Sequence, residues 1–281
     1  MRWWCATTTQ AWEWTPRPYV GVWLLVAVIA VAYARAVRRD TTPGRRRRAV
    51  WFGSGLATLW LASDWPLGPL GAGYLAWVHM LQFMLFTLVA APLLLLGTPE
   101  WLARSVLQKL RLSTAVRVVC HPVVAGITFN VLLVATHAPF TVDRLRTTQT
   151  GSFVLDMLWL AMGFLLWAPV IGPLPELVVR YVPARAAYLF LASSVFAMIP
   201  GGFITFSESP LYEIYRAAPR VGLTPLQDQQ AAGVLMKIGN IPIVWTVITV
   251  IYVRWYNRQL RHDRYRQAQR RGRDVLATID T

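Results

Sequence analysis

Seven apolar stretches constrain this chain more than any other feature of its sequence. A helix needs roughly 20 mostly apolar residues to cross the ~30 Å hydrocarbon core of a bilayer. The hydropathy pattern predicts seven spans, at about residues 19–37, 48–63, 74–97, 122–140, 152–172, 185–206 and 230–253. We therefore expect an all-α integral membrane protein, built as a bundle of about seven transmembrane helices.

The composition agrees with a membrane protein and disfavours two other classes. Hydrophobic residues make up 56% of the chain, and the formal net charge is +15. In a soluble protein this charge would suggest a nucleic-acid partner, but here the basic residues gather in short stretches beside the apolar ones, so we expect no nucleic-acid partner. The sequence holds no phosphate-binding loop, nucleophile motif or haem-attachment motif, and we do not expect an enzyme.

The distribution of Lys and Arg predicts the orientation of the bundle. The connections after the first, third and fifth spans, together with the C-terminal region, hold 21 basic residues, whereas the opposite side holds six. Loops rich in Lys and Arg stay in the cytoplasm. The sequence therefore predicts an N-terminus outside the cytoplasm and a cytoplasmic C-terminus.

These assignments divide the chain into three parts. Residues 1–18 form an extracytoplasmic segment, residues 19–256 the seven-helix membrane domain, and residues 257–281 a basic cytoplasmic tail. Within the membrane domain, about residues 99–118 alternate apolar and basic positions at helical spacing, which predicts a helix lying in the inner interface. We interpret the tail as a solvated basic segment that helps to set the orientation of the bundle. The alternative is that it binds anionic lipid or a partner.

Several polar side chains inside the predicted spans lie at one depth, near the outer face. Ionisable groups in a membrane segment cost several kcal/mol on most scales, which makes each of them a functional candidate. On the predicted order and direction of the spans, four separate helices carry polar side chains at this depth. The candidates are His79, His137, Asp156, Asp228 and Lys237.

Methionines at a similar depth add soft ligands to these imidazoles. Neutral imidazole and thioether sulfur suit Cu(I) better than hard cations. The pattern therefore predicts a sparse copper site of His79, His137, Met80 and Met84, which would hold the ion transiently. The alternative is structural, since a histidine often joins two helices and methionine often fills gaps in apolar packing.

Two further features leave alternatives open. Asp156 and Lys237 could form a buried ion pair, which would make both structural. The runs Pro200-Gly201-Gly202 and Gly239-Asn240-Ile241-Pro242 interrupt the last two spans. Broken helices can free backbone carbonyls for a transported substrate or can simply bend, so transport remains an alternative.

Several motifs, in a fixed order, resemble one protein family. The run from Tyr74 to Pro99, YLAWVHMLQFMLFTLVAAPLLLLGTP, is similar to the signature helix of the CtaG family of multi-helix cytochrome c oxidase assembly factors. The resemblance covers roughly residues 60–255. Further matching motifs are His121-Pro122, Thr136-His137-Ala138-Pro139-Phe140, Gly163 to Pro169, Thr205-Phe206-Ser207, Pro210-Leu211-Tyr212 with Tyr215, and Asp228 to Gly233.

The resemblance implies a role in maturing the copper-containing part of an aa-type oxidase, with copper delivered at the outer face. It implies oxidase subunits as partners and a multi-pass place in a bacterial plasma membrane. The chain departs from the family pattern at Phe83, where a second histidine is expected, and at Ser152 and Asp156, where a histidine pair is expected. A metal-free accessory subunit of a respiratory oxidase is therefore one alternative, and a copper transporter another.

Overall fold

The computed structural model describes residues 2–196 and 198–279, and within these ranges the chain forms helices and no strands. The elements are α1 (Val20–Val37), α2 (Arg45–Ser63), α3 (Leu67–Gly73), α4 (Ala76–Met84), η1 (Leu85–Ala90), α5 (Ala91–Gly97), α6 (Glu100–Lys109), α7 (Ser113–Val119), α8 (Pro122–His137), α9 (Pro139–Leu145), α10 (Gln149–Ile171), α11 (Val182–Phe190), η2 (Leu191–Val195), α12 (Met198–Phe206), α13 (Glu213–Arg216), α14 (Pro225–Ile238) and α15 (Ile241–Ile279).

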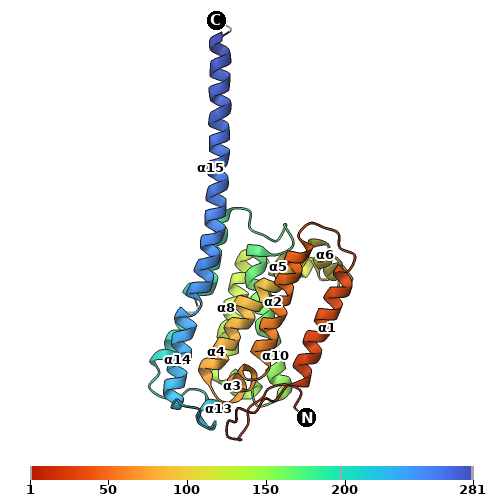
Figure 1. The fold of residues 1–281 in the computed structure, drawn as a ribbon. Coiled ribbons are helices and arrows are strands. Elements are labelled where there is room, and N and C mark those ends of the chain that lie inside the picture. The colour runs from red at the N-terminus through yellow and green to blue at the C-terminus, as the bar shows by residue number, and fades with distance from the viewer. Residues whose placement is uncertain (1, 197, 280–281) are drawn as a thin grey trace.

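The long helices run side by side, with short elements at both ends (Figure 1). Helix α2 packs against η1 and α5, α10 packs against η1, α5 and α8, and α14 packs against α4 and α12. The N-terminal segment, α3 and α13 lie at one end of the bundle, and α6 lies at the other, where α15 extends well beyond the bundle. On the predicted orientation, the first of these ends faces outward.

Among the described residues each predicted span lies mostly in helix, but fewer segments are both long and apolar enough to cross a membrane. Within the described residues, five segments are long and apolar enough to cross a membrane, and the pair α7 and α8, bent by 78°, raises the number to six if it counts as one span. Helix α2 has 19 residues, but it begins with four arginines, so its apolar part is short. The structure thus supports a membrane protein, while seven crossings and their orientation stay predictions.

The third predicted span contains a π-helical segment that links it to α10. The side chain of Thr87, inside η1, bonds back to the carbonyl of Phe83 at 2.7 Å. The carbonyl of Thr87 itself accepts a hydrogen bond from the indole of Trp167 at 2.9 Å. A π turn shifts the helical register, and such turns often lie at functional sites. Here the turn fixes α10 against the helix that carries His79.

The N-terminal segment folds back over the end of the bundle that carries α3 and α13. The backbone N–H groups of Trp3 and Trp4 both donate to the side-chain oxygen of Gln149, at 2.7 and 3.2 Å. The N–H of Thr7 donates to the carbonyl of Arg146 at 2.9 Å. Residues 2–8 therefore cover the beginning of α10, and Trp4 is completely buried there.

The structure shows where the helices break in the predicted interfacial region and near the predicted interruptions of the last two spans. The region 99–118 forms two helices, α6 and α7, which meet near Arg111, a residue with a φ of 55°. Of the two predicted interruptions, the one at Gly239-Asn240 separates α14 from α15, whereas Pro200-Gly201-Gly202 lies inside the continuous helix α12. Helix α15 then continues without a break through the described part of the basic tail.

Candidate functional site

Helix α4, which carries His79, begins at a carboxylate from another helix. The two side-chain oxygens of Asp228 accept hydrogen bonds from the backbone N–H groups of Ala76 and Trp77, at 2.7 and 3.0 Å. The first N–H groups of a helix have no partner within the helix, and the N-terminal end attracts negative charge. Asp228, buried at 3% exposure, thus ties the start of α4 to α14.

Replacing Asp228 by alanine should lower the free energy of unfolding by about 1 kcal/mol, as does the loss of a helix cap in general. Asparagine keeps one acceptor oxygen and loses the charge, so Asp228→Asn should fall between wild type and alanine. Thermal unfolding in mild detergent measures the effect. Asp263→Ala, at an exposed position of α15, is the control. Equal stability of Asp228→Ala and Asp263→Ala would contradict the capping role.

His79 and His137 meet in the interior of the bundle, near the end that carries α3. Their ring centroids lie 5.9 Å apart with nearly perpendicular planes. Both are 4% exposed. The indole of Trp159 lies beside both rings, 4.8 Å from the centroid of His79 and 5.7 Å from that of His137. Helices that are far apart in the chain thus bring together the two histidines predicted from their depth.

The partners of the ring nitrogens fix the proton on each imidazole. Arg146 Nε lies 3.3 Å from Nδ1 of His79, and a guanidinium can only donate, so this Nδ1 accepts and Nε2 carries the proton. Nδ1 of His137 lies 2.9 Å from the carbonyl oxygen of Leu133, which can only accept. Nε2 of His137 is therefore a free lone pair. Neither Nε2 atom has a hydrogen-bond partner within the described residues.

Tyr215 supports His79 from the segment between the last two predicted spans. Its hydroxyl oxygen lies 2.9 Å from Nδ1 of His79 and 2.6 Å from the carbonyl oxygen of Gly71. Burial raises the pKa of the Tyr215 hydroxyl well above its ordinary value, so the group keeps its proton. The neighbouring Tyr212 donates to the carbonyl of His137 at 2.8 Å. One short segment thus holds both histidines in place.

A buried ion pair lies beside the histidines. Arg146 Nη2 and Asp156 Oδ1 are 2.9 Å apart, and the two side chains are 0% and 1% exposed. The indole of Trp4 donates to the other oxygen of Asp156 at 2.8 Å. The guanidinium carbon of Arg146 lies 5.0 Å from the ring centroid of Trp159, which gives a cation–π contact. Asp156 is thus neutralised by Arg146 and covered by the N-terminal segment.

The alternative ion pair of Asp156 with Lys237 is wrong. The Lys237 ammonium lies 4.7 Å from the ring centroid of Phe206, on the α12 side of α14. The carboxylate of Asp156 is paired with Arg146 instead. The α9–α10 turn instead returns Arg146 to the first turns of α10, only ten residues before Asp156.

The predicted sulfur ligands line a cavity that neither histidine lines. Met80 and Met84 line a small cavity of about 20 Å³, together with Phe83 and Met236. The ring of Phe83 also contacts His137, with centroids 4.7 Å apart. Phe83 therefore lines this cavity and also contacts one of the two imidazoles. Within the described residues, no three His, Cys, Asp or Glu side chains are grouped closely enough to hold a metal ion.

Sequence reasoning missed several residues of this cluster. The sequence prediction used Arg146 only to count the charges of the loops. An aspartate inside a span requires a counter-ion, and Arg146 is among the basic residues nearest to Asp156 in the sequence. Tyr215 appeared only within a motif. Trp4 and Trp159 gave no signal, because apolar aromatic residues occur throughout the sequence.

Comparison with known proteins gives one match. A family model described as "Cytochrome c oxidase caa3 assembly factor (Caa3_CtaG)" matches residues 3–258, which is nearly the whole helix bundle together with the N-terminal segment over the site. Neither the curated proteins nor the solved structures gave a match.

Proposed function

This chain belongs to the cytochrome c oxidase caa3 assembly factor family, and we propose that it serves oxidase assembly by holding Cu(I) briefly between His79 and His137. Membership indicates a membrane-bound, non-catalytic protein that acts on the oxidase or during its assembly. We further propose that the protein lies in a bacterial plasma membrane, that its copper site lies at the outer face, and that a nascent oxidase subunit accepts the ion.

The two unpartnered Nε2 atoms carry this proposal. With metal–nitrogen distances of about 2.0 Å, two imidazoles that share one ion place their ring centres about 6 Å apart. The observed separation of the centroids, 5.9 Å, fits such an arrangement. Imidazole is a suitable copper ligand, and Met80 and Met84 add soft sulfur on the same helix as His79.

Copper binding through His79 requires its proton to change place. The proton must move from Nε2 to Nδ1, where the Tyr215 oxygen can accept it while the Tyr215 hydroxyl donates to Gly71. Arg146 must then turn its Nε away, with Asp156 holding the guanidinium. This adjustment, and the positive charge of Arg146, weaken the binding of a cation. A weak site suits an ion that is passed on.

The same contacts favour a second candidate, a metal-free partner of the oxidase. Arg146 already occupies Nδ1 of His79, and Phe83 fills the place where the family pattern has a further histidine. In this alternative the cluster only fixes the outer ends of α4, α8 and α10. The protein would then act through its surface, as an accessory subunit or a scaffold.

Anaerobic titration of the purified protein with Cu(I), in competition with a chromophoric chelator, separates the two candidates. We expect about one Cu(I) per chain. The double variant His79→Ala with His137→Ala should lose at least about tenfold in affinity, because even mutations of residues that only support metal ligands cost about 10–100-fold. His121→Ala, at an exposed position before α8, should bind as wild type does. Equal copper binding by wild type and the double variant would remove the metal role.

Affinity purification tests the assembly step itself. Capture of immature oxidase subunits alone supports transient assistance, whereas co-purification with mature oxidase at fixed stoichiometry supports an accessory subunit. The double histidine variant should still capture the subunits if the cluster serves copper rather than docking.

A further inference from the structure

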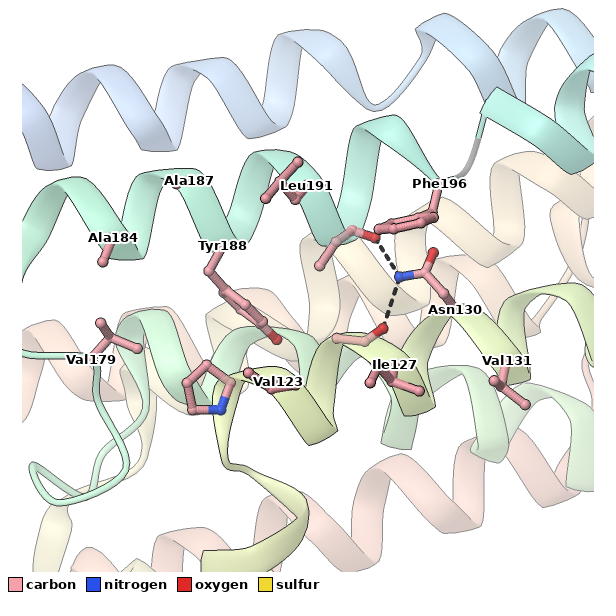
Figure 2. Close-up of a pocket in the computed structure, with 13 residues that line it drawn as sticks. Val123, Ile127, Asn130, Val131, Val179, Ala184, Ala187, Tyr188, Leu191 and Phe196 are labelled. Carbon is pink, nitrogen blue, oxygen red and sulfur yellow. Dashed lines mark hydrogen bonds between the residues drawn. The ribbon is translucent and has the colours of Figure 1, made fainter.

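An apolar groove on the outside of the bundle lies between α8 and the continuous segment α11–η2 (Figure 2). It has a volume of about 650 Å³, within the range of small-molecule sites. Its walls include Val123, Gly126, Ile127, Asn130, Tyr188 and Phe196. It is separate from the histidine cluster, since neither histidine lines it.

The groove faces outward and offers apolar surface to its occupant. Val123, Ile127 and Phe196 are 62%, 61% and 51% exposed, which in a membrane protein places them against lipid. The side-chain nitrogen of Asn130 donates to the carbonyls of Gly126 and Ala192, at 2.8 and 3.0 Å. Figure 2 shows both bonds running within the wall, so this amide joins α8 to η2.

The groove is as long as one leaflet of the membrane. Its α8 wall runs from Pro122 to Val131, and the nine helical steps between these residues span about 14 Å at 1.5 Å per residue. Half of the ~30 Å hydrocarbon core is about 15 Å. A transmembrane helix would need a surface about twice as long, whereas one acyl chain fills one leaflet.

A cation lies at one end of the groove. The guanidinium of Arg185 donates to the carbonyl of Val179, a lining residue, at 3.0 and 2.6 Å. Arg185 has no ion pair among the described residues, and the adjacent Arg180 is exposed. The nearby Glu176 is engaged by Arg104 through both oxygens, at 2.8 and 3.0 Å. The end of the groove is therefore basic.

We propose that this groove binds an anionic phospholipid, with one acyl chain between α8 and α11–η2 and the phosphate beside Arg185 and Arg180. On the predicted orientation the basic end faces the cytoplasm. Basic pockets between transmembrane helices on that side recognise anionic headgroups. The proposal is independent of copper, because no residue of the histidine cluster takes part.

Native mass spectrometry of the full chain tests this site. The protein is exposed to phosphatidylglycerol or to phosphatidylcholine with identical acyl chains and is then released from detergent in the spectrometer. We expect one phosphatidylglycerol retained at least about fivefold more than phosphatidylcholine. Arg185→Gln with Arg180→Gln should remove the preference. Gly126→Leu should remove the bound lipid, because a Cβ at Gly126 has room, 3.5 Å from Tyr188, while the rest of the leucine enters the groove.

The matched control is Gly53→Leu, since a Cβ at Gly53 meets nothing within 4 Å and the residue lies outside the groove. This variant should retain lipid as wild type does. Equal retention of the two lipids by wild type would overturn the proposal, as would unchanged lipid binding by Gly126→Leu. If Gly126→Leu keeps its lipid but loses co-purifying oxidase subunits, the groove takes a protein helix and the lipid proposal is wrong.

Discussion

Replacing Asp156 by alanine should lower the free energy of unfolding by about 3–5 kcal/mol, the cost of removing one partner of a buried ion pair. The guanidinium of Arg146, 0% exposed, would remain without its carboxylate partner at 2.9 Å. Arginine cannot lose its proton to avoid this cost. The indole of Trp4 would also lose its acceptor, so the N-terminal segment should be held less firmly against α10. Thermal unfolding in mild detergent and limited proteolysis of residues 2–19 measure the two effects.

Two further variants isolate the uncompensated charge as the cause. Asp156→Ala combined with Arg146→Met removes both charges and should recover most of the lost stability. Glu176→Ala breaks an ion pair with Arg104 whose partners are 44% and 36% exposed, and should cost no more than about 1 kcal/mol. A double variant as unstable as Asp156→Ala alone would show that the packing of Asp156, rather than its charge, holds this region.

The helices of the bundle could largely be predicted from the sequence, because hydropathy reports length and polarity directly. The apolar run at 152–172 became α10, Gln149–Ile171, with only small differences at its ends. The bend of 78° between α7 and α8 could not be predicted in the same way. It depends on how two short helices pack at the end of the bundle, and hydropathy contains no such information.

The sequence predicted the depth of the site residues along their helices but not the side of each helix on which they lie. A helix rises by a constant 1.5 Å per residue, so the order of the spans places His79, His137 and Asp156 at one level. The face on which a side chain lies depends on packing angles between helices. That is why Lys237, predicted at a similar level, contacts Phe206 instead of Asp156. Arg146 required a loop to fold back into the interior, which local sequence does not show.

The close approach of α10 to η1 and α5 should depend on Gly163. A Cβ built at this position would lie 2.6 Å from the Cβ of Ala91 and 2.8 Å from the carbonyl oxygen of Thr87. The obstructing atoms at Thr87 belong to the backbone, so a side-chain rotation cannot relieve the contact. Gly163→Ala should therefore lower the free energy of unfolding by about 2–3 kcal/mol, as overpacking does in other cores.

The displacement should also reach the histidine cluster, because α10 carries Trp159 and the indole of Trp167, which bonds to Thr87 at 2.9 Å. Tryptophan fluorescence and thermal unfolding in mild detergent measure both effects. Gly53→Ala introduces the same methyl group in α2, where nothing lies within 4 Å, and should be neutral or stabilising by up to about 1 kcal/mol. If Gly163→Ala is as stable as Gly53→Ala, the helices do not approach as closely as this contact requires, and the position of Trp159 beside His79 would lose its main support.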